Sequence, residues 1–517
     1  MTHGALARAG LVVMGAFLAS RVLGGLRVVV LGNQFGDAPA ELDAYFAAFR
    51  IPDLIFQLVA AGAVASALVP ILSGIIASGE HARAWRVVST VTNLMIGSLL
   101  VLAILMAVSA PAIVPLLVPG FDADTTALTV ELTRLMLIAP VFLAAGAIAS
   151  AVLNTEGRFG AAALAPVMYN AAIIGGALLL GPGMGVHGAA VGVVVGAILH
   201  LAIQLPALRG HLRYAPRVHL EDEAARRSFW LMLPRAVGMG ANQITFLINT
   251  LLASTVAVGA VVSYNVAFSV LQIPLGVVGL PLGIVLLPSL SRAMASGQDV
   301  EFGRLVVGSL RLLLWATVFL AAVGIVVRDE VVTLLFGWSF DAATLASTAA
   351  TLGVFLVGLP AHALNVILAR AFYSGQDTAT PVTIAVAAVA VNVVISLLTI
   401  ERLGLQGLAL GIAVGAWFEA ITLTLLLRRR STALSVGAVA RGGAASLGGA
   451  LLSAVAAAVV LAALPVASLG GGASGLAIQL TLVALSSGGC YLLYSRLMRL
   501  PELPRTLGLL RSALRPG

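Results

Sequence analysis

The chain has 517 residues, of which 60% are hydrophobic and only 10% are charged, and its mean hydropathy is +1.08. This composition leaves too little polar surface for a soluble globular protein. The formal net charge is +8 and Cys490 is the only cysteine, which excludes an internal disulfide and a cysteine-ligated metal cluster.

Arginine occurs within the first two membrane-length apolar segments. The first contains Arg21 and Arg27, in SRVLGGLRVVVLG, and the second contains Arg50, in AYFAAFRIPDLIF. An arginine at the centre of a bilayer costs about 2.5 to 3.5 kcal/mol on insertion scales, so we expect these side chains to face a wet cavity or an anion. Phosphate oxygens match a guanidinium group in bidentate geometry. Asp43 or Asp53 would instead neutralise the charge within the protein.

Apolar runs of about 18 or more residues recur along the whole chain, and each is long enough to cross a hydrocarbon core of roughly 30 Å. They lack the period-two polarity of membrane β-barrel strands. The sequence therefore predicts an all-α, polytopic membrane protein of about fourteen transmembrane helices. The predicted spans are 8–32, 43–77, 86–110, 130–153, 160–181, 186–208, 229–254, 260–290, 305–327, 343–373, 379–400, 404–427, 442–464 and 474–495.

The basic residues, all arginine, fall mainly in alternate loops. Arg83, Arg86 and Arg304 mark one side of the membrane, whereas Asp122 and Asp341 lie in the intervening loops. The positive-inside rule then places both termini in the cytoplasm, in agreement with an even number of crossings. Because this placement accounts for the net charge, no nucleic-acid partner is expected.

The chain resembles itself at an offset near 220 residues. VPILSGIIASG (69–79) matches LPSLSRAMASG (287–297). The offset of six helices is even, so the sequence predicts two parallel six-helix repeats, 1–209 and 210–430, with a site between them. Helices 13 and 14 and the tail, 431–517, lie outside the repeat. A second match aligns Pro140, Ala149, Ala151 and Asn154 with Pro360, Ala369, Ala371 and Ser374.

Later helices hold further polar candidates. Arg235, after Pro234 in helix 7, is a comparable cation from the second half, and Asn249 is one of several amides deep in the same region. In lipid such groups need a partner, which is either another helix or a substrate. Glu419 in helix 12 is a candidate for coupling a proton or sodium ion, or else the partner of an interhelical donor.

Six stretches, in this order, resemble segments that recur in the MurJ (MviN) lipid II flippases of the multidrug/oligosaccharidyl-lipid/polysaccharide exporter superfamily. The resemblance covers helices 1 to 12. It implies a V-shaped bundle of two lobes around a cationic cavity, with helices 13 and 14 forming a groove for a polyprenyl tail. The stretches are SRVLGGLR, LDAYFAAFRIPDLI, GAVASALVPILSG, QITFLINTLLAS, GIVLLPSLSRAMASG and ARAFYSGQDTATPV.

The resemblance also implies roles for single residues. Arg21 and Arg27 match the functional arginines of the family's first helix, Asp43 matches the acidic residue that opens helix 2, and Arg50 matches a basic position before the IPD turn. Together with the candidates from helix 7, the expected substrate-binding residues are Arg21, Arg27, Asp43, Arg50, Arg235 and Asn249.

Several positions depart from the family pattern. Charged residues are common in the family where this chain has Val28, Phe56, Ala61, Phe268, Ser269 and Gln272. These departures remove charge from the second-half side of the cavity. They leave open a divergent relative that handles another polyprenyl-phosphate-linked glycan, with Arg235 in place of the missing charge.

The implied activity is the movement of undecaprenyl-pyrophosphate-linked disaccharide-pentapeptide, lipid II, from the cytoplasmic to the outer leaflet of the bacterial cytoplasmic membrane. Alternating access needs no catalytic residue, cofactor or metal. The expected partners are lipid II and membrane lipids, and the sequence leaves open whether cell-wall synthesis proteins also bind. The protein is expected to be a monomer. The alternatives are a MATE-like drug exporter, which would want midplane carboxylates, a membrane enzyme of polyprenyl phosphates, and a non-transporting scaffold.

Overall fold

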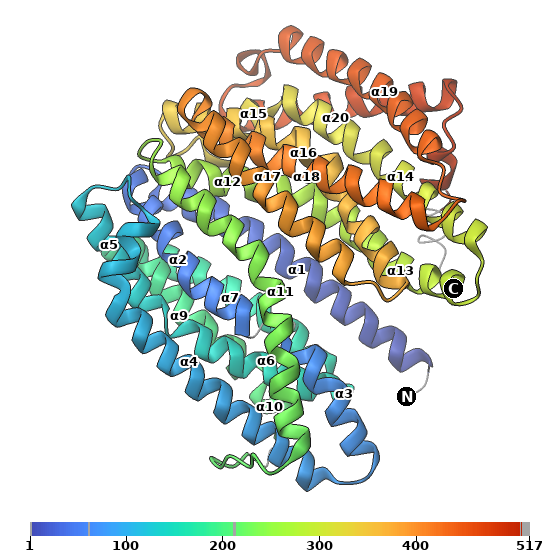
Figure 1. Ribbon diagram of the computed structural model, residues 1–517. Coiled ribbons are helices and arrows are strands. Elements are labelled where there is room, and N and C mark those ends of the chain that lie inside the picture. Colours follow the sequence, from blue (N-terminus) through green and yellow to red (C-terminus); the bar gives the residue numbers. More distant parts are fainter. Residues whose placement is uncertain (1–2, 60–62, 210–213, 507, 509–517) are drawn as a thin grey trace. The chain divides into compact units, whose positions relative to one another are not determined.

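The computed structural model is helical, with no β-strand in the part of the chain that it describes (Figure 1). That part comprises residues 3–59, 63–209, 214–506 and 508, and it leaves out the side chains of 3–14, 58, 59, 63–67, 229, 231–242, 280, 281 and 284. The all-α class predicted from the sequence is confirmed. Twelve described helices are long and apolar enough to cross a membrane.

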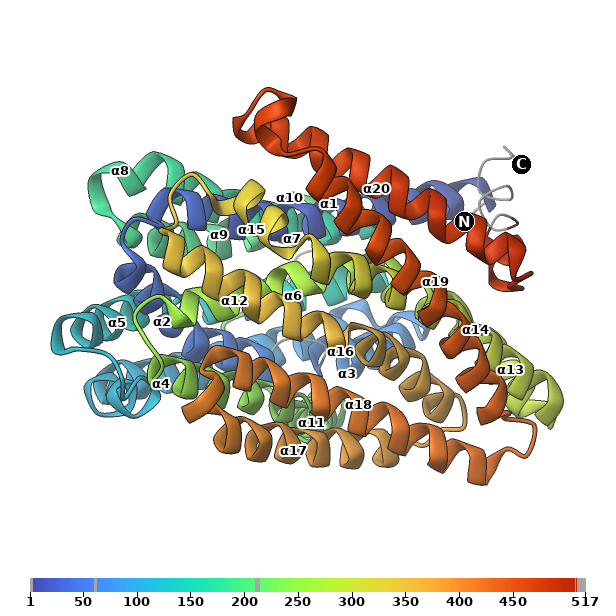
Figure 2. The same cartoon turned by 90° about the horizontal axis from the view of Figure 1, so that it is seen from above.

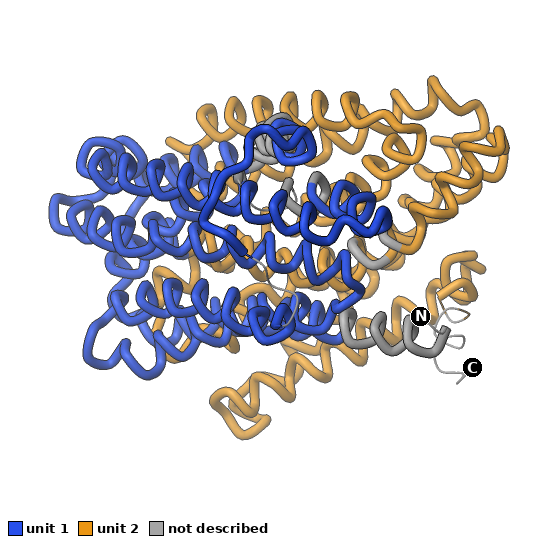
Figure 3. The backbone as a smooth tube through the Cα atoms, turned by 90° about the horizontal axis from the view of Figure 1, so that it is seen from below, with its two compact units in different colours: residues 1–262 blue, residues 263–517 orange. Residues whose placement is uncertain are grey.

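The first compact unit comprises residues 1–262 and is blue in Figure 3. Its core is formed by aliphatic side chains of the second, third, fourth and sixth helices, such as Ile51, Leu72 and Val91. The elements of this unit are α1 (His3–Phe35), α2 (Pro39–Val59), α3 (Ala63–Ala77), α4 (His81–Leu117), α5 (Ala123–Met136), α6 (Ala139–Thr155), α7 (Phe159–Gly175), the π-helical segment η1 (Gly176–Leu180), α8 (Gly181–Met184), α9 (Val186–Ala202), α10 (Leu205–Leu208), α11 (Glu223–Ser254) and the first turn of α12 (Ala260–Pro274).

The second unit comprises residues 263–517 and has its own core, which includes Leu290, Leu310 and Leu368. Within it, α17 packs on α18 and α19 packs on α20, as both Figure 1 and Figure 2 show. After α12, its elements are the π-helical segment η2 (Leu275–Gly279), α13 (Leu280–Ala295), α14 (Asp299–Val326), α15 (Arg328–Phe336), α16 (Ala342–Ser374), α17 (Ala379–Leu403), α18 (Leu405–Arg430), α19 (Val436–Ala463), the 3-10 turn η3 (Val466–Leu469) and α20 (Gly472–Leu497).

The twelve helices coincide with twelve of the fourteen predicted spans. The predicted span 43–77 consists of α2 and α3, on either side of residues 60–62, which lie outside the described part. The span 229–254 is α11, most of whose first half has no described side chains. The span 260–290 is divided at Pro274, where a π-helical segment follows because proline lacks the backbone N–H that a regular helix needs.

The internal repeat has the same turn geometry in both copies. Gly79 has φ +80° and follows α3, and Gly297 has φ +64° and follows α13. Each glycine N–H donates to a carbonyl three residues earlier, over 3.0 Å to Ile76 and 3.1 Å to Met294. Positive φ favours glycine, which explains why the motif ASG ends both matching stretches.

A stripe of glycines also recurs with the repeat. On α9 and on α18, three glycines at four-residue spacing face a neighbouring helix so closely that a Cβ would meet its backbone. A Cβ on Gly192 would lie 2.8 Å from the Ala172 oxygen, and one on Gly411 would lie 2.6 Å from the Asn392 oxygen. The stripes are Gly188, Gly192 and Gly196, and Gly407, Gly411 and Gly415.

The lobe boundaries predicted at 209 and 430 rest on the repeat and stay a prediction. Packing alone divides the chain at 262, because α11 packs against α2, α3 and α4 of the first unit. In the described part of the second unit, α19 and α20 pack on α14 and α15 rather than forming a separate body.

Candidate substrate-binding site

Arg27 lies on α1 beside the aromatic residues of α2. Its Cζ atom is 5.9 Å from the centre of the Phe49 ring, and Tyr45 and Tyr169 are within its electrostatic range. Aromatic faces attract a guanidinium group without neutralising it. The contact with Phe49 therefore leaves the charge of Arg27 in place.

Arg21 lies six residues earlier on α1 and is exposed, with Cζ 5.2 Å from the centre of the Phe17 ring. Neither Arg21 nor Arg27 forms an ion pair with any acidic residue that the structure describes. Two arginines in one apolar helix that form no ion pair with a described carboxylate are the arrangement expected of an anion site.

Arg50 is held on α2 by α11. Its Nε donates a 3.1 Å hydrogen bond to Oγ1 of Thr250, and its Cζ is 5.1 Å from the centre of the Phe246 ring. Asp53, one turn further along α2, interacts electrostatically with Arg50 and more weakly with Arg27. Asp53 is therefore the carboxylate that offsets part of the positive charge here.

Asp43 has a different position. Its Oδ2 accepts a 2.7 Å hydrogen bond from the backbone N–H of Gly259, and its Oδ1 accepts one of the same length from Val262. The side chain is 1% exposed. A carboxylate at the N-terminal end of a helix satisfies free N–H groups and interacts favourably with the helix dipole, so Asp43 fixes the first turn of α12. Its predicted contact with substrate stays a prediction.

Of the two candidates on α11, the structure describes the side chain of Asn249 but not that of Arg235. Asn249 is fully buried next to Thr250, the residue that binds Arg50. The backbone of Arg235 is helical, but its side chain lies outside the described residues. Thr250 and Phe246 were missed by the sequence analysis, because their contact with Arg50 joins segments about 200 residues apart.

Two of the positions that depart from the family pattern, Phe268 and Phe56, have apolar surroundings. Phe268 stacks on Tyr264 with ring centres 6.3 Å apart and meets Phe355 edge-on at 5.7 Å. Ser269 donates its hydroxyl to the Asn265 carbonyl oxygen. Phe56 packs against the core of the first unit, and Ala61 lies outside the described residues. An aromatic cluster thus occupies the place where the family commonly has an aspartate.

The second unit contains an apolar groove of about 740 Å³ between α14, α16, α18 and α19. Trp417 forms part of one wall, and its Nε1 donates to the Val357 carbonyl oxygen. The resemblance implied a groove formed by helices 13 and 14; the structure has helix 13, α19, as one wall, and the residues lining the groove include none from α20. The other walls include Leu314, Val318, Ile325, Pro360, Leu364, Ile421 and Leu425.

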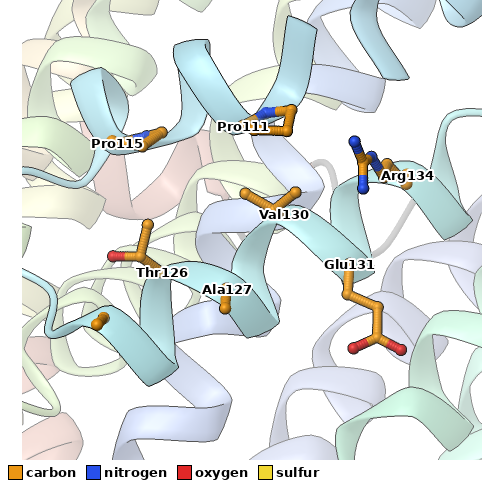
Figure 4. Close-up of a pocket in the computed structure, with 8 residues that line it drawn as sticks. Pro111, Pro115, Thr126, Ala127, Val130, Glu131 and Arg134 are labelled. Atoms are coloured by element: carbon orange, nitrogen blue, oxygen red, sulfur yellow. The ribbon is translucent and has the colours of Figure 1, made fainter. Parts of the chain in front are cut away.

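A cavity of about 720 Å³ in the first unit lies between the end of α4 and α5 (Figure 4). Its charged residues have partners. Arg134 donates from Nε to the Ala107 carbonyl oxygen over 2.9 Å, and an oxygen of Glu131 is 3.3 Å from Nε2 of His187. The described residues contain no group of three or more potential metal ligands.

Glycine-packed helices that recur with the repeat, twelve candidate spans, and arginines on α1 that form no ion pair with a described acidic residue define a multi-pass membrane transporter. A family model described as "Lipid II flippase MurJ" matches residues 31–479. The chain therefore belongs to the MurJ family of lipid II flippases, whose members reside in the inner membrane.

Individual relatives agree. The chain is similar to "Lipid II flippase MurJ" of Burkholderia cenocepacia, at 34% identity over 82% of this chain and 84% of the relative. It is also similar to "Probable lipid II flippase MurJ" of Rhizobium tropici, at 31% identity over 83% and 82%.

Solved structures support the same fold. "Lipid II flippase MurJ, inward closed conformation" matches with a TM-score of 0.79 at 21% identity, covering 94% of this chain and 98% of that one. An inward-facing MATE family transporter matches with a TM-score of 0.70 at 17% identity, covering 80% and 95%.

Proposed function

We propose that the protein moves lipid II, the undecaprenyl-pyrophosphate-linked peptidoglycan precursor, from the cytoplasmic to the outer leaflet by alternating access. The observation that carries the proposal is the pair of arginines on α1, which form no ion pair with a described acidic residue. Relatives of the chain that are named lipid II flippases support it.

Arg21 and Arg27 bind the pyrophosphate. A guanidinium group presents fixed donors that fit phosphate oxygens in pairs. Arg50 completes the positive site, and its hydrogen bond to Thr250 holds its side chain in one orientation. Asn249 and Arg235 belong to the same proposed site from α11, and Asp43 supports it by fixing the start of α12.

The polyprenyl chain occupies the apolar groove of the second unit. Its lining residues are almost all aliphatic or aromatic, and burying the chain there needs no polar contact. A long lipid tail and a charged head thus have separate binding surfaces, as transport of such a lipid requires.

The membrane potential drives net export. A negative-inside potential contributes about 2.3 kcal/mol per charge per 100 mV to outward movement of an anion. A transport cycle driven in this way needs no covalent step, metal or cofactor. In this proposal the protein acts as a monomer, and both of its termini lie in the cytoplasm.

A second candidate is a flippase for another polyprenyl-phosphate-linked glycan. Phe268 favours it, because this ring, packed on the buried Tyr264 and Phe355, offers a substrate no charge at a position where the family pattern has one. An exporter of organic cations fits less well, since both oxygens of Asp43 are taken by backbone N–H groups.

Complementation tests the proposal. Expression of this chain in a bacterium depleted of its own lipid II flippase is expected to restore growth, and the Arg27→Ala variant at equal abundance is expected to fail. The exposed Arg86 gives a matched control, since Arg86→Ala removes an arginine outside the site. Lack of growth with wild-type protein present in the membrane would favour the second candidate.

A further inference from the structure

The segment after α20, residues 501–506, lies along α14 and is held there by a buried ion pair. Arg311 donates a 2.6 Å hydrogen bond from Nε to Oε1 of Glu502, and the Glu502 side chain is 1% exposed. One turn nearer the start of α14, a Cβ on Gly308 would lie 3.1 Å from Nη1 of Arg505. The segment therefore follows α14 toward the end at which that helix begins.

The end of α20 is anchored to the same helix. Trp315 donates from Nε1 to Oγ of Ser495 over 3.0 Å, and the hydroxyl of Tyr491 donates to the Trp315 carbonyl oxygen over 2.6 Å. α19 passes close to the ion pair, where a Cβ on Gly442 would lie 2.7 Å from Nε of Arg311. The pair is thus enclosed by α14, α19 and the C-terminal segment.

This ion pair adjoins one end of the apolar groove. Arg311 precedes the groove residue Leu314 by three positions, which places it on the same face of α14. Arg428 follows the groove residue Thr424 by four positions on α18 and likewise shares its face. The loop after α18 is at this end as well, because a Cβ on Gly303 would lie 2.7 Å from the oxygen of Ala433 in that loop.

Arg311 and Arg428 therefore lie one helical turn beyond the groove residues Leu314 and Thr424. Arg428 is exposed and has no ion pair with a described residue. Among the described residues, the ion-pair partner of Arg311 is Glu502, whose other oxygen, Oε2, has no hydrogen-bond partner in the described part of the chain. A buried ion pair contributes little net stability over neutral groups of the same shape, and a phosphate offers a guanidinium more acceptor oxygens than a carboxylate does.

We propose that Arg311 binds the phosphate of a polyprenyl phosphate or pyrophosphate whose chain lies in the groove. When no lipid is bound, Glu502 forms the ion pair with Arg311 in its place. The C-terminal segment is then a gate whose carboxylate the lipid phosphate displaces. Arg428 supplies a second guanidinium. This loading site rests on the proposed function and adds a phosphate contact to those of α1.

Binding of undecaprenyl phosphate to the full-length protein in nanodiscs tests this, with undecaprenol as the probe that has the same chain and no phosphate. Glu502→Gln frees Arg311 from its anion and is expected to strengthen undecaprenyl phosphate binding about tenfold, with undecaprenol unchanged. The double variant Arg311→Gln, Glu502→Gln keeps a neutral hydrogen-bonded pair and is expected to weaken it about tenfold. Arg496→Gln, at an exposed arginine of α20, is the control.

Melting temperatures measured in parallel separate folding from binding. If Glu502→Gln alone proves unstable, undecaprenyl phosphate binding by the neutral double variant is the measurement that tests the proposal. A double variant that melts like the wild type and still prefers undecaprenyl phosphate over undecaprenol to the same degree would overturn the loading site and leave the pair a structural contact. Failure of the proposed function is distinguishable, because there the wild-type chain itself would not complement a flippase-depleted strain.

Discussion

The carboxylate of Asp43 on α2 accepts a 2.7 Å hydrogen bond from the backbone N–H of Gly259, 216 residues later in the chain. Together with the bond from Val262, this contact fixes where α12 begins. The contact joins α2, the helix that carries Arg50, to the first turn of α12, and both lie in the first unit. These two hydrogen bonds therefore contribute to fixing the position of α2, and so of its arginine.

Replacing Asp43 by asparagine is expected to destabilise the protein. An amide has only one acceptor oxygen, and its NH₂ group would oppose the second backbone N–H, so about 1.5 to 3 kcal/mol of charge-assisted hydrogen bonding is lost. Thermal unfolding in detergent would show a lower melting temperature for Asp43→Asn. Asp37→Asn, at an exposed position of the preceding loop, should melt like the wild type; equal melting of both variants would contradict the structural role.

The contact between Arg50 and Thr250 predicts a selective effect on transport. Thr250→Val removes the hydroxyl oxygen that accepts from Arg50 but keeps the branched shape of a fully buried side chain. Because Arg50 then loses one of the contacts that orient its side chain, transport is expected to fall roughly tenfold, the equivalent of about 1.4 kcal/mol, while abundance changes little. Thr245→Val on the same helix is the matched control. Undiminished transport by Thr250→Val would show that this bond does not position Arg50.

The glycine stripes predict where added volume is not tolerated. Gly192→Ala and Gly411→Ala would each push a methyl group into the backbone of the facing helix, and overpacking of this kind costs about 1 to 3 kcal/mol. Gly488→Ala on α20, where a Cβ would have open space within 4 Å, is the control. Lower melting temperatures for the first two variants alone are expected, and tolerance of both would contradict the close helix packing.

The sequence predicted the class and much of the layout because these follow from local signals. Apolar length predicts a span, and the match between 69–79 and 287–297 predicts the repeat, whose two copies end in the same positive-φ turn at Gly79 and Gly297. Arg21 and Arg27 form no ion pair with a described acidic residue, and their role at an anion site stays a prediction. These features depend on the residues themselves and on their nearest neighbours in the chain.

Other features depend on tertiary packing that no periodicity encodes. The partner of Arg50 is 200 residues away, and the hydrogen bonds of Asp43 are made by backbone groups that have no sequence signature. The groove was equally hidden. In a membrane protein an apolar face is as compatible with lipid as with a groove, so Trp417 and Ile421 did not reveal which of these they contact.

Acid stability should depend on the turn between α16 and α17. Hydrogen bonds from Thr380, and then the charge of Arg430, lower the pKa of Asp377 from 3.8 to about 2. A depressed folded-state pKa stabilises the fold above pH 4 or so, and this contribution is lost as the pH falls from about 4 to about 2.

The variant Asp377→Asn removes the charge of this side chain and so measures what the charge contributes to the stability of the fold. Its melting temperature should lie below that of the wild type at pH 6, and the difference should shrink as the pH is lowered to about 2.5. Asp124→Asn, at an exposed residue of α5, serves as the control. A difference that stays constant over this range would show that the charge of Asp377 contributes nothing to stability.

The central claim is that the arginines of α1 carry a lipid pyrophosphate across the membrane. Its most direct test is the rate at which purified protein moves fluorescent lipid II between the leaflets of proteoliposomes under an imposed membrane potential. The wild type is expected to move lipid II in the direction that carries negative charge toward the positive side, and the Arg21→Ala, Arg27→Ala double variant, reconstituted in equal amount, is expected to be inactive. Equal rates for the two proteins would contradict the claim.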